Sequence, residues 1–279
     1  MIFKSTLTLV FNILLVQVLF AQKVQNVQES SIWATTPVKV DGKLNEETFE
    51  PSNKSTLLSY TMSNDDKNLY LVMKSDDNTN NNKIMMGGIT LSINTDGKKK
   101  EKDGFAVTYP VLVRQQGQRG GGQRQGGQQG GFGQRMQGGS SDSAALVRRK
   151  QQLAAVKEIK VAGFKDITDS LISIYNEYEI VAVAKFDDQG AYIYELAIPL
   201  KLLGLTTSSK EFAYNIRVNG LQLGFGGGFG GGGQDGGFGG GQGGGGFGGG
   251  QRGGGGRGGF DPSAFLPTDF WGKYTLAKK

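Results

Sequence analysis

The chain of 279 residues has a net charge of +6 and contains neither histidine nor cysteine. The absence of histidine excludes Ser-His-Asp and Cys-His catalysis, and it also excludes zinc sites built on imidazole. The absence of cysteine excludes disulfide bonds, so the fold has to be stabilised by a hydrophobic core.

The first 21 residues are typical of a secretory signal peptide. Lys4 precedes an apolar run from Leu7 to Phe20, and Ala21 is a residue after which a signal peptidase could cut. The alternative is an uncleaved anchor, but the apolar run is shorter than the roughly 20 residues that a spanning helix needs. We therefore expect a secreted, periplasmic or cell-surface protein with no membrane span after cleavage.

Glycine is concentrated in two low-complexity segments. Of the 47 glycines, 26 lie in residues 224–259 and 11 in residues 117–139. These segments have too few apolar side chains to offset the entropy cost of ordering, so we expect two disordered loops inserted into one domain that spans residues 22–279. Residues 117–139 carry +3 and residues 224–259 carry +1 of the net charge, so the body is nearly neutral. A nearly neutral body does not favour nucleic-acid binding.

The body between these segments has the pattern of β-structure. Val, Ile, Tyr and Phe dominate short runs that turn residues separate, which is typical of antiparallel strands. The sequence predicts strands at Val38–Val40, Ser55–Met62, Asn68–Ser75, Gly88–Asn94, Phe105–Val113, Glu177–Phe186, Ala191–Pro199, Phe212–Leu221 and Trp271–Leu276. The turn Asp187–Gly190 predicts a hairpin between two of them.

One segment departs from this pattern. Residues 143–156 (SAALVRRKQQLAAV) are rich in good helix formers and follow Ser140, Ser141 and Asp142, which can cap a helix. We expect a short helix there, and the complete prediction is an all-β, two-sheet antiparallel sandwich with one short helix.

Carboxylates are the remaining candidates for catalysis, but their positions favour turns. The pairs are adjacent in sequence and lie in or beside turns: Glu46/Glu47, Asp65/Asp66, Asp76/Asp77 and Asp187/Asp188. Side chains in such positions commonly cap the backbone or face water, so we do not expect an enzyme or a cofactor. A structural calcium ion near Asp41, Asp76 or Asp77 is the alternative use of these oxygen ligands.

Six motifs in chain order resemble the family 9 carbohydrate-binding modules and the related DOMON-like sandwiches. They are VKVDGKLNEETF, NDDKNLYLVMKSDD, GITLSINTDGK, YIYELAIPLKLLG, FAYNIRVNG and FWGKYTL. The resemblance covers residues 33–279 apart from the inserts and the helix. It departs from the family at Phe49, where relatives often have Trp.

This resemblance implies a two-sheet sandwich that binds a poly- or oligosaccharide. In the family's sugar-binding members, aromatic rings clamp the sugar, while Arg, Asn, Gln and Glu side chains bind its hydroxyls. On these grounds the expected ligand-binding residues are Trp271, Arg217, Asn219, Trp33 and Tyr109. The alternatives without a ligand are purely structural. They are a core position for Trp271, an N-terminal packing role for Trp33, and a solvated strand face for Arg217 and Asn219.

Three functions remain open from the sequence. The first is a secreted, non-catalytic glycan-binding module. The second is a structural or adhesive protein whose Gly/Phe-rich loops associate weakly, since GGFGGGQ occurs at 236–242 and again at 245–251. The third, RNA binding through the Arg-Gly-Gly triplets, conflicts with the export signal.

Overall fold

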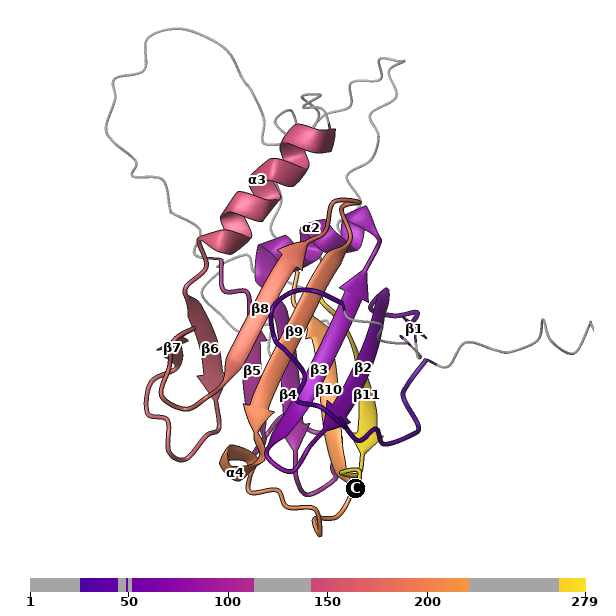
Figure 1. The fold of residues 1–279 in the computed structure, drawn as a ribbon, viewed down its shortest axis with the longest axis vertical. Helices are drawn as coiled ribbons and strands as arrows, with labels where there is room; N and C mark the ends of the chain where they lie inside the picture. The colour runs from indigo at the N-terminus through magenta and orange to yellow at the C-terminus, as the bar shows by residue number, and fades with distance from the viewer. Residues whose placement is uncertain (1–25, 45–48, 50–51, 113–141, 221–265) are drawn as a thin grey trace, which may run out of the picture.

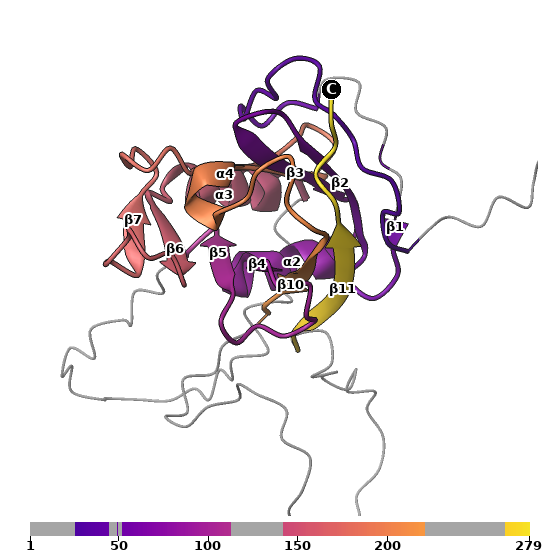
Figure 2. The same cartoon turned by 90° about the horizontal axis from the view of Figure 1, so that it is seen from below.

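A computed structural model describes residues 26–44, 49, 52–112, 142–220 and 266–279. The expected signal peptide and both glycine-rich inserts lie outside the described residues. In the part that is described, two antiparallel sheets face each other, which confirms the predicted β-sandwich (Figure 1). Figure 2 looks along the strands and shows β2 and β3 in one layer, with β4 and β10 in the other.

The first sheet has five strands in the order β1-β2-β3-β9-β8. Their bounds are Ser52–Asn53, Leu58–Asn64, Asn68–Ser75, Tyr192–Pro199 and Val181–Phe186. The predicted hairpin joins β8 to β9, and Asp187 forms its turn by accepting hydrogen bonds from the backbone N–H groups of Gln189 and Ala191.

The second sheet has six strands in the order β11-β10-β4-β5-β6-β7. Their bounds are Thr268–Tyr274, Phe212–Val218, Ile89–Asn94, Phe105–Tyr109, Glu158–Ala162 and Leu171–Ser173. The short strands β1, β6 and β7 were not predicted, and residues 38–40 do not form the predicted strand.

The described residues form three helices, where the sequence predicted one. The predicted helix is α3 (Asp142–Ala154), which packs on β8. The helix α2 (Asn78–Gly87) leads from β3 in one sheet to β4 in the other, and α4 (Leu200–Leu203) is a single turn after β9. Among the described residues, no helix has the length and apolarity needed to span a bilayer.

The core lies between the sheets and has tyrosines at its centre. The hydroxyls of Tyr60 and Tyr214 are 2.8 Å apart and fully buried, so each strand supplies the other's hydrogen-bond partner. Gly272 in β11 leaves room for this arrangement, because a Cβ there would lie 2.2 Å from the Tyr214 ring.

The N-terminal segment, residues 26–44, crosses the outside of the five-stranded sheet (Figure 1). There the Glu195 carboxylate accepts a hydrogen bond of 2.7 Å from the backbone N–H of Gly42 and is 1% exposed. The N-terminal segment thus supplies the hydrogen-bond partner of this buried carboxylate.

Candidate functional site

The candidate site lies on the face of the six-stranded sheet that is turned away from the five-stranded sheet. In β10 the residues Phe212, Tyr214, Ile216 and Val218 point into the core, so Ala213, Asn215 and Arg217 point outward. In β11 the same alternation buries Phe270 and Tyr274 and turns Asp269 and Trp271 outward.

Strand register brings these outward residues together. Asn215 lies opposite Trp271, and Arg217 lies opposite Asp269. On the other side of β10, Ser92 and Thr90 of β4 lie opposite the same two residues. We call this set the outer patch; it consists of Thr90, Ser92, Asn215, Arg217, Asp269 and Trp271.

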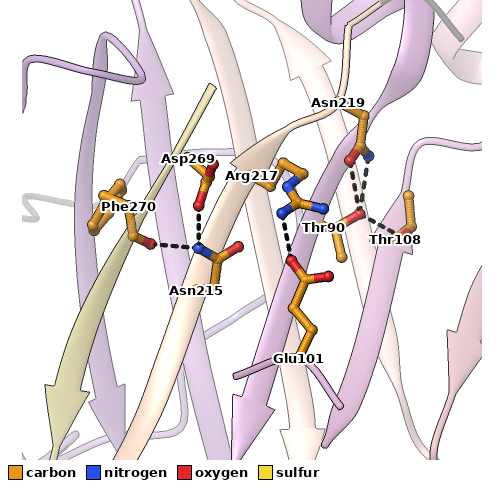
Figure 3. Close-up of polar contacts among 8 residues, drawn as sticks. All are labelled: Thr90, Glu101, Thr108, Asn215, Arg217, Asn219, Asp269 and Phe270. Carbon is orange, nitrogen blue, oxygen red and sulfur yellow. Dashed lines mark hydrogen bonds and ion pairs between the residues drawn. The ribbon is translucent and has the colours of Figure 1, made fainter. Parts of the chain in front are cut away.

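The connection between β4 and β5 adds a charged partner to the outer patch. Glu101 lies in this connection, and its Oε1 forms an ion pair with Arg217 Nη2 at a distance of 2.5 Å (Figure 3). Arg217 has five N–H donors in a planar fork, so it can keep this contact and still bind a further acceptor. Guanidinium and carboxylate therefore offer donors and acceptors side by side.

Asn215 has the only buried side-chain oxygen of the outer patch that lacks a partner among the described residues. Its Nδ2 donates to Asp269 Oδ2 at 2.7 Å and to the carbonyl oxygen of Phe270 at 3.0 Å (Figure 3). Both acceptors need an N–H group, which fixes the orientation of the amide and leaves Oδ1 as the free acceptor. An unpaired buried acceptor costs about 1–3 kcal/mol, which a hydroxyl donor would offset.

Asn219 lies beside the outer patch but already has its hydrogen bonds. Its Nδ2 donates to the Gly87 carbonyl and to Thr90 Oγ1, both at 2.9 Å. Thr90 in turn shares a 2.7 Å hydrogen bond with Thr108 (Figure 3). Asn219 therefore ties the end of β10 to the end of α2 and to Thr90 of β4. Its contribution to the site is to position β10 beside these two elements.

Trp271 lies on the outer patch and is half-buried. Among the described residues, it is not one of those that form the hydrophobic core. One face of the sheet thus carries three of the predicted ligand residues: Trp271, Arg217 and Asn219.

The other two predicted ligand residues lie elsewhere. Trp33 forms an isolated parallel bridge with Asn64 beside the five-stranded sheet, and it lines a separate groove of about 540 Å³. Tyr109 points into the core and is 4% exposed, and burial raises the pKa of its hydroxyl. Neither residue joins the outer patch.

The acidic residues considered for calcium are engaged in local contacts. Asp77 accepts from the backbone N–H of Asn80 at 2.6 Å as the N-cap of α2, Asp76 pairs with Lys74 at 3.1 Å, and Asp41 accepts from the backbone N–H of Lys43 at 2.9 Å. The described residues contain no group of three or more acidic side chains that could hold a metal ion. Asp65 also caps a turn, as the sequence predicted for these carboxylates.

Sequence reasoning missed Glu101 and four residues of the outer patch: Thr90, Ser92, Asn215 and Asp269. Asn215 precedes Arg217 by two positions in the same strand, so the alternation already placed both on one face. Glu101 had no signal in the sequence, because it reaches Arg217 from a connection whose path depends on the folded structure.

Comparison with known proteins gives a distant structural similarity. No protein-family model matches the chain, and no sequence among the curated proteins matches it. The chain is similar to a solved structure of a family 9 carbohydrate-binding module from Caldicellulosiruptor kristjanssonii in complex with glucose, with a TM-score of 0.30 and 9% identity. The alignment covers 70% of this chain and 79% of that one.

Proposed function

We propose that this protein is a secreted, non-catalytic binding module that takes a carbohydrate on the outer patch. The observation that carries the proposal is the position of Trp271 directly opposite Asn215, whose Oδ1 is an unpaired acceptor. A half-buried indole next to an oriented acceptor suits a sugar, which presents C–H groups on one face and hydroxyls at its edge.

The charged pair completes the set of groups that a sugar needs. Arg217 supplies donors and Glu101 supplies acceptors, and the two are held together at 2.5 Å. Because their charges compensate, we expect a neutral sugar to bind better than an acidic one. Vicinal hydroxyls can accept from the guanidinium and donate to the carboxylate at the same time.

The engagement of the acidic groups supports a binding role over catalysis. Asp269 accepts from Asn215, and Glu101 pairs with Arg217. A glycosidase needs two carboxyl groups that face the scissile bond, one of them free to protonate it. The carboxylates of this site instead orient an amide and a guanidinium.

The test is glycan-array screening followed by isothermal titration with the best oligosaccharide. We expect Trp271→Ala to weaken binding at least tenfold, which corresponds to about 1.4 kcal/mol, because it removes the stacking surface. Trp33→Ala is the matched control, since it removes the same type of side chain from the separate groove beside Asn64.

Two results would contradict the proposal. One is the absence of binding to every soluble and insoluble polysaccharide tested. The other is a loss of binding in Trp33→Ala with none in Trp271→Ala, which would move the site to the groove beside Asn64.

A further inference from the structure

A second pocket lies beneath α3, on the opposite side of the six-stranded sheet from the outer patch. It has a volume of about 380 Å³ and is bounded by α3, β8 and β5. Three alanines line it, Ala154 from the helix and Ala182 and Ala184 from β8. A sandwich core often has larger side chains at such positions. The three methyl groups fill less of the volume and leave the pocket open.

The inner wall of this pocket is aromatic. Tyr109 and Phe186 both line it, and their rings rest on Tyr194 and Tyr192, with centroids 6.4 Å and 5.4 Å apart. The Arg149 guanidinium lies 5.8 Å from the centre of the Phe186 ring and holds the helix against this wall. An apolar or aromatic ligand body would therefore meet ring and methyl groups.

Two buried tyrosine hydroxyls behind this wall have no hydrogen-bond partner among the described residues. They belong to Tyr192 and Tyr194, which are fully buried. Burial raises the pKa of both hydroxyls, and the nearby Tyr109 hydroxyl raises it further, so all three stay protonated as donors. Each hydroxyl can donate and accept, so two buried polar groups without a partner lie behind the aromatic wall.

The mouth of the pocket is positively charged. Lys150, Lys157 and Lys185 line it, and among the described lining residues there is no carboxylate. Lys150 pairs with Asp188 at 2.8 Å, and Lys185 donates to the backbone carbonyl of Asp41. Within the described part of the chain Lys157 has no ion pair, so its ammonium group is available to an anion.

We infer that this pocket binds a small carboxylate with an apolar or aromatic body. The volume falls within the roughly 300–1,000 Å³ of typical small-molecule sites. The apolar body would pack against the alanines and the Tyr109 and Phe186 rings, while the carboxylate would lie at Lys157. The lysines at the mouth select an anionic ligand over a neutral or cationic one.

The experiment is isothermal titration of the full chain with 4-phenylbutyrate and with its neutral amide. Ala154→Phe fills the pocket from an exposed helix position, and Ala155→Phe is the matched control because Ala155 is exposed and does not line the pocket. Lys157→Gln removes the free charge, with Lys165→Gln as its exposed control outside the pocket.

We expect the wild type to bind the carboxylate at least tenfold more tightly than the amide. Ala154→Phe should weaken binding at least tenfold and Lys157→Gln about threefold to tenfold, while both control variants keep the wild-type affinity. Glycan binding at the outer patch should be unchanged in all four variants.

The inference is overturned if the wild type gives no binding heat at millimolar 4-phenylbutyrate. It is also overturned if the amide binds as well as the acid, or if Ala154→Phe binds like Ala155→Phe. These outcomes concern the pocket alone, so they are distinguishable from failure of the carbohydrate proposal.

Discussion

Glu195 couples its ionisation to folding. It is 1% exposed, and loss of solvent raises the pKa of its carboxyl group, while the hydrogen bond from the Gly42 backbone N–H offsets part of the rise. A pKa raised by folding means that the folded state holds the proton to higher pH than the unfolded chain does. This contribution to stability is fully present below the unfolded pKa of about 4.3, and it is lost as pH rises through the folded value.

Wild-type stability should therefore fall relative to the Glu195→Gln variant as pH rises from about 4 towards neutrality. Urea denaturation at a series of pH values measures the difference in the free energy of unfolding. Glu179→Gln is the opposite control, because Lys201, at 2.8 Å, lowers the pKa of the exposed Glu179 carboxyl. For this pair, the free energy of unfolding of the wild type should rise relative to that of Glu179→Gln as pH increases through the acidic range. A flat difference for Glu195→Gln would contradict the buried-carboxylate argument.

Single side chains were predictable where strand alternation decides their direction. Alternation along the strand put Arg217 and Asn219 on one face, and β10 does turn Arg217 away from the core. It did not reveal that Asn219 is already hydrogen-bonded, because its partners Gly87 and Thr90 lie more than 100 residues away in the sequence. Hydrogen bonds of this kind depend on tertiary structure and have no local signal.

The helix α2 depends on its N-cap. Asp77 accepts from the Asn80 backbone N–H at 2.6 Å, and the helix that follows contains four asparagines, which are weak helix formers. We expect Asp77→Ala to lower the free energy of unfolding by about 1 kcal/mol. Asp76→Ala is the neighbouring control and should cost less, since its pair with Lys74 is exposed. If both carboxylates instead bound calcium, the two variants would have similar effects and EDTA would lower the Tm of the wild type.

Strands were predicted more accurately than helices for a physical reason. The run from Asn68 to Ser75 was predicted with both its ends correct, because apolar residues with turn residues on either side require no information about neighbours. The segment Asn78–Gly87 was not predicted, because its asparagines resemble a turn and its helix is stabilised by the cap and by burial of Ile84. Tertiary contacts outweigh local propensity in such segments.

At the scale of the whole molecule, the outer patch depends on strand order. Both β3–β9 and β4–β10 pair across more than 100 residues of sequence. Periodicity predicts strands and their inward faces, but it carries no information about which strands become neighbours. The sandwich could therefore be predicted, whereas the convergence of β4, β10, β11 and Glu101 on one surface could not.

The register of β10 and β11 also shows how the second insert is tolerated. Val218 lies opposite Thr268, so the two ends of the intervening segment meet in a single antiparallel pair. Closure entropy grows with the logarithm of length, so a long connection here costs little more than a short one. The folded body therefore has no requirement for the length of this connection.

Deleting residues 226–258 shortens the connection from 49 residues to 16, and it should leave the fold intact. The expected change is a gain of about 1 kcal/mol in the free energy of unfolding, measured by urea denaturation. Replacing the same residues with a Gly-Ser linker of equal length is the control and should leave stability unchanged. If the outer patch alone binds glycan, both variants should bind like the wild type. Loss of glycan binding or surface adhesion at unchanged stability would instead assign the function to the insert, as the adhesive alternative requires. A drop in stability would mean that residues 226–258 take part in the fold.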